Sequence, residues 1–415
     1  MAVVVIAGVG LVGSCLAIAR LPNLVESPGR FLALFALAFV CYAAGVASLP
    51  SGNGRRPLAL VLVVGAAARL VLFPALPTLS TDAYRYVWDA RVAHAGISPY
   101  AYPPWATELE PLRDTEVFPR LNHPTWRTIY PPGAQAFFQL VYRIRPDSVR
   151  AVKLAVGLVE LVGALAVCGL LRAGRRPLSD AIVYVWNPLV LVEVWATAHV
   201  DALLVPAVAG AAWMALRGRH FAAGALLGAG ALIKLYPAAL LALLPLAAWP
   251  AALLSFGAVV VAGYAPAVLS GTAVLGSLPR YLSEESFNVG VVRSLVPSPL
   301  LSVAAAAAWI VIVSAMRRVV ALPLRAVTLV GGLLVLSPNI FPWYAIWLVP
   351  FLAWSPSVPW IAFTGTVMFA YTFFLQEPWA IPGWARTLEF APLAIGILWR
   401  CATRVSARLR QKRSA

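Results

Sequence analysis

Charged residues are scarce in this sequence. Asp, Glu, Lys and Arg make up 12% of the 415 residues, whereas soluble globular chains carry about 25%. Apolar residues account for 61%, and the apolar runs that recur along the whole chain are each long enough to cross a bilayer. No polar stretch between them is long enough for a soluble domain. The sequence therefore predicts one integral membrane domain over 1–415, an all-α, polytopic transmembrane helical bundle.

Cysteine is also rare, which limits the possible metal and disulfide chemistry. The four cysteines lie inside apolar runs, without a CxxC pair, so neither a disulfide framework nor a zinc site is indicated. No set of His, Cys, Asp and Glu residues has metal-ligand spacing, and we expect no metal. Lysine occurs only three times, beside heavy use of Ala, Val and Leu, a bias associated with GC-rich bacterial genomes.

The net charge of +16 comes from short basic clusters between apolar runs. This placement is the positive-inside pattern of cytoplasmic loops, and it argues against a nucleic-acid partner. It predicts a cytoplasmic N-terminus in a multi-pass protein of the cell inner membrane. The clusters are Arg55-Arg56, Arg172 with Arg175-Arg176, Arg217 with Arg219, Arg317-Arg318, and a tail from Arg404 to Arg413.

About fourteen segments could cross the membrane. The eighth and the twelfth are short enough to be re-entrant segments instead. The expected spans are 2–20, 31–49, 57–77, 149–171, 178–195, 200–216, 219–236, 237–249, 251–269, 299–316, 321–337, 342–354, 357–376 and 387–402.

Two long loops, 78–148 and 270–298, are placed outside by this topology. The first is rich in aromatic residues and should be ordered and functional, because long loops in compact proteins usually are. Counting 130–145 as a crossing would move the Arg172–Arg176 cluster outside. We therefore predict a helix at the outer interface there.

The first loop begins with a predicted helix. Ser80 or Thr81 is a suitable N-cap, and Gly96 is a suitable stop. Asp82, Arg85 and Asp89 share one face at spacings of three and four. A purely structural explanation is that Asp82 interacts with the helix dipole and Asp89 pairs with Arg85.

This loop resembles those of the GT-C superfamily of polyprenyl-phosphate-sugar-dependent glycosyltransferases. It is similar to bacterial polyprenol-phosphate-mannose-dependent mannosyltransferases and to the first mannosyltransferase of GPI-anchor assembly. The loop residues that carry the resemblance are Thr81-Asp82, Tyr84, Asp89-Ala90, Ser98-Pro99-Tyr100 and Tyr130-Pro131-Pro132. Weaker matches are Asn187-Pro188, His199-Val200-Asp201 and Gly228 to Pro237.

The resemblance implies an inverting transferase in which Asp82 is the catalytic base. It implies a hexose donor, most simply mannose, on a polyprenyl phosphate, with no cofactor. It also implies a glycan or glycolipid acceptor outside the membrane. The chain departs from the family in having two extra crossings before the catalytic loop and no soluble C-terminal domain, which bears on the substrate more than on the chemistry.

The chemistry favours the same residue for an independent reason. A polyprenyl phosphate leaves without a general acid, so one carboxylate that deprotonates the acceptor hydroxyl suffices. Cations must then hold the phosphate while negative charge develops on it. Arg85 and Arg127 flank the motif and are the preferred contacts, although external arginines can also bind ordinary anionic lipid headgroups.

Other residues have both a functional and a structural explanation. Asp89 could orient Arg85 or the acceptor, and Tyr130 could shape access for the lipid. His199 and Asp201, at an outer helix end, could contact substrate or act as a helix cap.

Charged residues in apolar helices raise the same choice. Lys234 could neutralise a phosphate. Alternatively, charges such as Glu160, Glu193 and Lys234 could form interhelical ion pairs, for example Glu193 with Lys234. The competing functions are a secondary transporter or lipid flippase, which should show paired broken helices in two halves, and a non-catalytic assembly scaffold.

Overall fold

The computed structural model describes residues 1–413 of the chain and the side chains of residues 1–403. Helices and connecting loops make up this part of the chain, with no strand within 1–413. The all-α prediction is confirmed. The basic tail from Arg404 to Arg413 lies outside the residues whose side chains are described.

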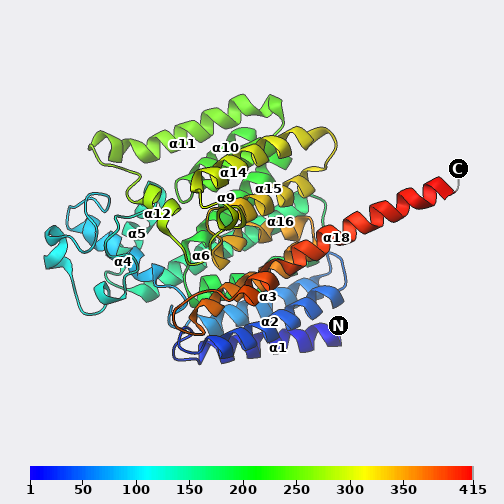
Figure 1. Cartoon of the computed structure of the whole chain (residues 1–415), viewed down its shortest axis with the longest axis horizontal. Helices are drawn as coiled ribbons and strands as arrows, with labels where there is room; N and C mark the ends of the chain where they lie inside the picture. Colours follow the sequence, from blue (N-terminus) through cyan, green and yellow to red (C-terminus); the bar gives the residue numbers. More distant parts are fainter. Residues whose placement is uncertain (414–415) are drawn as a thin grey trace.

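The N-terminal part is a layer of three helices along one side of the bundle (Figure 1). They are α1 (Ala2–Ala19), α2 (Pro28–Ser48) and α3 (Arg55–Leu72). Pro28 and Pro57 stand in the first turns of α2 and α3, where a missing N–H costs nothing. Glycine lets this layer approach the centre closely, since a Cβ on Gly45 would lie 2.6 Å from the Trp186 ring.

The central part of the chain contains the most buried helices. α6 (Val149–Ala173) begins at Ser148, whose side chain caps the Ala151 amide. It is followed by α7 (Ile182–Val185), α8 (Pro188–Val190) and a π-helical segment, η4 (Leu191–Ala196). A 50° bend separates the two halves of this span at Asn187-Pro188, because proline cannot continue the hydrogen-bond ladder.

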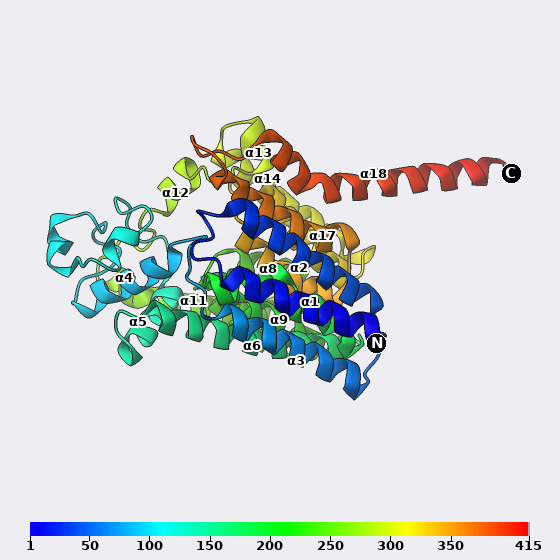
Figure 2. The same cartoon turned by 90° about the horizontal axis from the view of Figure 1, so that it is seen from below.

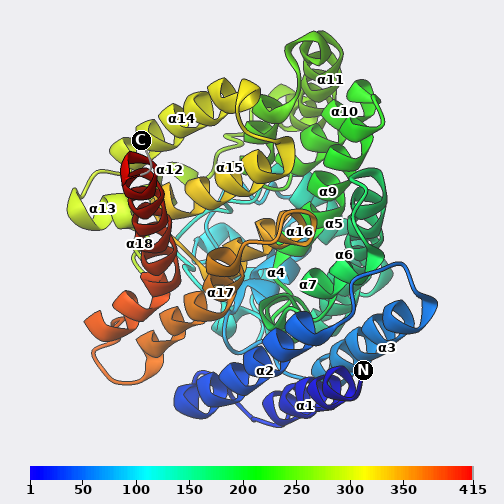
Figure 3. The same ribbon diagram turned by 90° about the vertical axis from the view of Figure 1, so that its right-hand side faces the viewer.

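The chain then passes three further helical segments on its way to the periphery. They are η5 (Val200–Leu203) leading into α9 (Leu204–Leu216), α10 (His220–Ala231) and η6 (Tyr236–Leu243). α11 (Trp249–Leu269) and α14 (Pro299–Ala315) lie at the rim of the end-on view in Figure 3. Only 11% of the apolar window of each is buried.

The last helices of the chain complete the bundle. They are α15 (Leu322–Leu336), η9 (Pro342–Trp347) with α16 (Val349–Trp354), α17 (Val358–Thr366) with η10 (Val367–Phe374), and α18 (Gly383–Arg413). α16 lies near the centre in Figure 3, and α18 extends past the bundle in Figure 1.

Each of the fourteen predicted spans overlaps a helical segment. Five helices in 1–413 are long and apolar enough to cross a membrane alone, and six if the bent pair counts as one span. The short eighth and twelfth spans correspond to η6 and to η9 with α16. The structure is thus a polytopic helical membrane bundle, and the number of crossings stays a prediction.

Both long loops gather at one end of the bundle, opposite the N-terminus (Figures 1 and 2). The first carries α4 (Asp82–His94), η1 (Thr107–Leu112), η2 (Phe118–Arg120) and α5 (Pro132–Ile144). The second carries α12 (Leu278–Glu284) and α13 (Val291–Leu295). The predicted helices at 82–95 and 130–145 are present as α4 and α5, and Gly96 ends α4 with a φ of 79°.

α5 is joined directly to the end of α10. The amide groups of Gly133 and Ala134 donate to the Leu232 carbonyl at 2.8 and 3.2 Å. A Cβ on Gly133 would lie 2.7 Å from the Leu232 Cβ, so this contact requires glycine. The orphan donors at the start of one helix therefore satisfy a carbonyl at the end of another.

Several buried charges in the bundle are paired, in one case differently from the prediction. Arg69 on α3 forms a two-point ion pair with Glu160 on α6, at 2.9 and 2.6 Å. The suggested pair of Glu193 with Lys234 is wrong, because Glu193 contacts His199 and Lys234 contacts Asp201. The bend at Asn187-Pro188 and the π-helical turn that follows direct Glu193 away from α10.

Candidate functional site

A cavity of about 1350 Å3 lies where the two external loops meet the bundle. Its walls come from the start of α4, the segment 116–131, the α10–η6 junction, α12 and η9. Most of the lining is apolar or aromatic, with a few charged groups, as expected of a site that takes an amphipathic ligand.

Asp82 lines this cavity at the first turn of α4. Its Oδ1 accepts a hydrogen bond from the Asn122 amide at 2.6 Å, and its backbone N–H donates to the Ser80 hydroxyl at 3.2 Å. No Lys, Arg or His nitrogen of residues 1–403 lies within 4.0 Å of the carboxylate. Asp82 therefore retains an oxygen that can accept a proton from a ligand.

Arg85 lines the cavity one turn further along α4. Hydrogen bonds to groups behind the cavity wall fix the orientation of its side chain. Its Nε donates to Asp89 at 2.8 Å, and its Nη2 donates to the Trp126 carbonyl at 3.0 Å. Gln135 of α5 donates to the other Asp89 oxygen at 2.8 Å. Nη1 has no hydrogen-bond partner within the described side chains and is free for an anion. The predicted Arg85–Asp89 pair is confirmed, and Asp89 itself is buried behind the cavity wall.

Arg127 and Tyr130 lie on the wall that faces α12. The Arg127 side chain is exposed and makes no ion pair in the part of the chain described, while its backbone N–H donates to Ser277 at 2.9 Å. Tyr130 is buried against Tyr86 and Phe138, with ring centroids 5.2 and 5.4 Å away. Its carbonyl accepts from the Tyr100 hydroxyl at 2.7 Å, which connects two of the motif segments.

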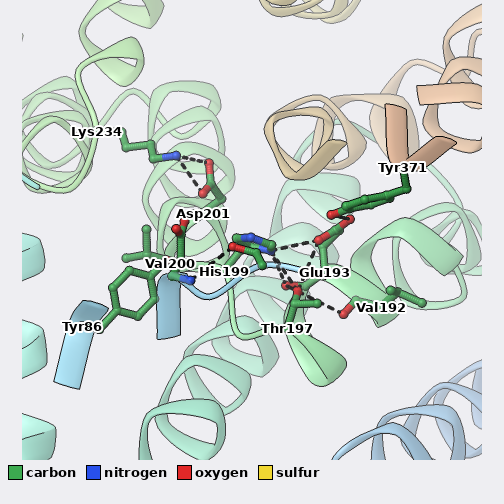
Figure 4. Close-up of polar contacts among 11 residues, drawn as sticks. Tyr86, Val192, Glu193, Thr197, His199, Val200, Asp201, Lys234 and Tyr371 are labelled. Atoms are coloured by element: carbon green, nitrogen blue, oxygen red, sulfur yellow. Dashed lines mark hydrogen bonds and ion pairs between the residues drawn. The ribbon is translucent and has the colours of Figure 1, made fainter. Parts of the chain in front are cut away.

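Lys234 and Asp201 form a neutralised pair at the cavity floor (Figure 4). The Lys234 ammonium lies 2.8 Å from both Asp201 oxygens, and Trp347 Nε1 donates to Asp201 at 2.6 Å. Lys234 lines the cavity with 19% of its side chain exposed, whereas Asp201 is 1% exposed. Asp201 is thus engaged by two donors and does not line the cavity.

His199 is placed beneath the cavity and does not line it. Its side chain is 0% exposed, with Nδ1 at 2.9 Å from both Glu193 and Thr197. Tyr371 donates to the second Glu193 oxygen at 2.9 Å, and Figure 4 shows these groups pointing toward one another. The His199 ring stacks on Trp343, 3.9 Å between centroids. His199 therefore supports a cavity-lining tryptophan, and its predicted contact with substrate stays a prediction.

The aromatic residues of η9 are stacked on one another. Trp347 lies between Tyr236 and Tyr344 at 4.1 and 4.5 Å, and Lys234 lies 4.4 Å from the Tyr344 centroid. Phe341 also stacks on Trp343, with 4.5 Å between the ring centroids. Because their faces are occupied, these rings form a rigid wall that offers edges to a ligand.

Several cavity residues were not predicted from the sequence, and most of them lie in irregular segments. Asn122 contacts Asp82, while His123 pairs with Glu285 of the second loop at 2.9 Å. Arg150 lines the cavity at the start of α6 with its side chain exposed. A polar residue directly after a short turn was the only sequence signal for Asn122, and it is a weak one.

Tyrosine hydroxyls near Asp82 remain neutral donors. Burial, followed by electrostatic interactions with Asp82 and Tyr86, raises the pKa of Tyr130 well above its usual value. Burial, followed by Tyr344, Glu285 and Asp82, raises the pKa of Tyr281 in the same way. The second effect places Asp82 within electrostatic range of the second external loop.

Within the described residues, no group of three or more His, Cys, Asp or Glu side chains could hold a metal ion. The acid and base groups that line the cavity belong instead to separate pairs or, like Asp82, stand alone.

The chain was also compared with known proteins. No curated protein sequence matches it. Residues 31–252, just over half of the chain, match the family model described as alpha-(1→6)-mannopyranosyltransferase, N-terminal domain. This range includes the first external loop with Asp82, Arg85 and Asn122, together with Asp201 and Lys234. The match agrees with the mannosyltransferase resemblance carried by the loop motif. The chain therefore belongs to the MptA_B family of alpha-(1→6)-mannopyranosyltransferases.

Proposed function

We propose that this glycosyltransferase takes mannose from a polyprenyl-phosphate donor and adds it to a glycan or glycolipid acceptor outside the cytoplasmic membrane of a bacterium. Asp82 is the general base. The observation that carries the proposal is the Asp82 carboxylate itself, which lines the large cavity, is held by one amide and is not neutralised by a cation of residues 1–403.

The reaction is a single displacement. The acceptor hydroxyl oxygen attacks the anomeric carbon while its proton passes to Asp82. The bond from the anomeric carbon to the phosphate oxygen breaks, and the polyprenyl phosphate leaves with the electron pair. The step inverts the anomeric configuration, so an alpha-(1→6) product, as in the family's description, requires a β-linked donor.

Arg85 and Arg127 are the proposed contacts for the donor phosphate. Arg85 is held rigidly by Asp89 and the Trp126 carbonyl and keeps Nη1 free, and Arg127 is exposed without an ion pair in the described chain. Fixed cations of this kind stabilise charge that develops on a leaving phosphate. Lys234 has its charge balanced by Asp201 and is assigned to holding the aromatic wall of η9.

The test is transfer of radiolabelled mannose in membranes that contain the wild type or Asp82→Asn. Polyprenyl-phosphate-mannose and a nucleotide-linked mannose are supplied in parallel. We expect transfer only from the lipid-linked donor and a loss of about 10²- to 10⁴-fold in Asp82→Asn, the range attributed to general-base catalysis. Asp180→Asn is the matched control, because Asp180 pairs with Arg176 away from the cavity.

Each component of the proposal can fail separately. Transfer only from the nucleotide-linked sugar would remove the lipid donor from the proposal and leave the base in place. Undiminished transfer by Asp82→Asn would remove the base.

A further inference from the structure

The segment 121–128 of the first external loop lies between Asp82 and the second external loop. We propose that Asn122 is a positioning residue for Asp82, and that the second loop holds Asn122 in place through Glu285. The proposal rests on the role of Asp82 as the base. It adds the residues that orient this carboxylate and the part of the chain that supplies them.

Asn122 fixes one of the two carboxylate oxygens. Its amide donates to Asp82 Oδ1 at 2.6 Å, while Ser80 accepts from the Asp82 backbone N–H at 3.2 Å. A hydrogen bond to the charged form of a carboxylate stabilises that form and sets the plane of the group. Oδ2 is left for the acceptor hydroxyl, so Asn122 determines the direction in which the base accepts a proton.

The turn that carries Asn122 depends on contacts with other residues for its conformation. His123 has a φ of 44°, a left-handed conformation that is uncommon for non-glycine residues and is stabilised by surrounding contacts. The His123 ring stacks on Trp126 at 4.2 Å, and its Nε2 lies 2.9 Å from Glu285. These contacts maintain the conformation that directs Asn122 toward Asp82.

The second loop supplies the outer contacts of this turn. Besides Glu285, the Arg280 guanidinium lies 5.0 Å from the Trp126 centroid, and Ser277 accepts from the Arg127 backbone N–H at 2.9 Å. Burial acts to raise the pKa of Glu285, but His123 and the backbone N–H groups of Phe287 and Ser286 outweigh it and lower this pKa below its usual value. Residues 277–287 lie outside the matched range 31–252, so a later part of the chain completes the site.

Other charged groups share the cavity and form the background for any pH effect. The cations are Arg85, Arg120, His123, Arg127, Arg150 and Lys234, and the other carboxylates are Glu116, Asp147 and Glu285. Glu116 pairs with Arg120, Asp147 with Arg91 and Glu285 with His123. Asn122 is the group that contacts the Asp82 carboxylate directly, so its removal should act on that carboxylate before any other.

The first experiment is the pH dependence of mannose transfer from polyprenyl-phosphate-mannose by Asn122→Ala in membranes. The lost hydrogen bond favours the protonated carboxylate, so we expect the acidic limb of the kcat profile to move upward by about one pH unit. kcat should fall about tenfold or more while KM for the donor stays unchanged, because the phosphate contacts are intact. Asn122→Asp should move the limb further, because two adjacent carboxylates share one proton.

The second experiment removes the outer support. Glu285→Gln should lower kcat and move the acidic limb part of the way toward that of Asn122→Ala. Glu108→Gln is the matched control, since Glu108 of η1 is exposed, does not line the cavity and pairs with no cation of residues 1–403, and the variant should behave as the wild type.

These outcomes separate the inference from the proposed function. Thermal unfolding in detergent verifies that each variant is folded, and Asn122→Asp, which keeps the size of the side chain, replaces Asn122→Ala if the latter does not fold. A folded Asn122 variant could show an unmoved acidic limb and an unchanged kcat while Asp82→Asn is inactive. That result would overturn the role of Asn122 and leave the role of Asp82 in place. An active Asp82→Asn would overturn the role of the base on which it rests.

Discussion

Several buried charges of the bundle are paired with an opposite charge, whereas several charges around the cavity are not. In the bundle, Arg69 is paired with Glu160, Lys234 with Asp201 and His199 with Glu193. Around the cavity, Asp82, Arg127 and one nitrogen of Arg85 have no opposite charge beside them in the described chain. Unpaired charge inside a bilayer is costly, whereas a cavity open to water tolerates it. The difference marks the groups that are available to substrate.

The largest expected effect comes from breaking a bundle pair. Glu160→Ala leaves Arg69 buried without its partner and should lower the free energy of unfolding by about 3–5 kcal/mol, as for other broken buried pairs. Thermal unfolding in detergent measures this change. The double variant Arg69→Met with Glu160→Leu removes both charges and should recover most of the lost stability. Equal instability of both variants would show that the pair is not the source of the effect.

A smaller effect is expected when a cavity charge is removed. Arg127→Ala takes away an exposed cation without leaving a buried partner, so stability should stay within about 0.5 kcal/mol. The donor KM should rise about tenfold, which corresponds to about 1.4 kcal/mol. Arg143→Ala, an exposed external arginine that does not line the cavity, is the control. A similar KM for both variants would assign Arg127 to general headgroup binding.

The smallest effect concerns the ion pair of Asp114 with Arg91 at the outer surface. Burial acts to raise the pKa of Asp114, but hydrogen bonds from Arg91 and from the Phe118 and Val117 amides lower it from 3.8 to about 2. A lowered native pKa contributes stability above pH 3.8 that is lost as the pH falls toward 2. The stability difference between wild type and Asp114→Asn, about 1 kcal/mol or less for a partly exposed pair, should therefore vanish over this range. A difference that persists at pH 2 would contradict this origin.

Local patterns in the sequence predicted much of the fold and the first part of the site. Helix caps and periodicity place α4 and pair Arg85 with Asp89, because both effects depend on neighbours within one helix turn or two. The partners of Glu193 and Lys234 could not be predicted in this way. They depend on the π-helical turn of η4 and on the left-handed Ala198, which has a φ of 64°, and both follow from tertiary packing.

The contact of Asn122 with Asp82 could not be predicted from the sequence. It lies in an irregular segment whose path is fixed by His123, Trp126 and contacts with α12, more than 150 residues further along the chain. Nothing in the neighbouring residues specifies that path. The residue that contacts the proposed base became evident only when both external loops could be seen together.

The hydrogen bonds from Gly133 and Ala134 to the Leu232 carbonyl have a mechanical consequence. They join α5 end to end with α10, two residues before Lys234, and the close approach at Gly133 leaves no slack. A shift of α5 is therefore expected to change the position of Lys234 and, through Asp201, of Trp347. The outer helix and the aromatic wall of the cavity are mechanically coupled through these contacts.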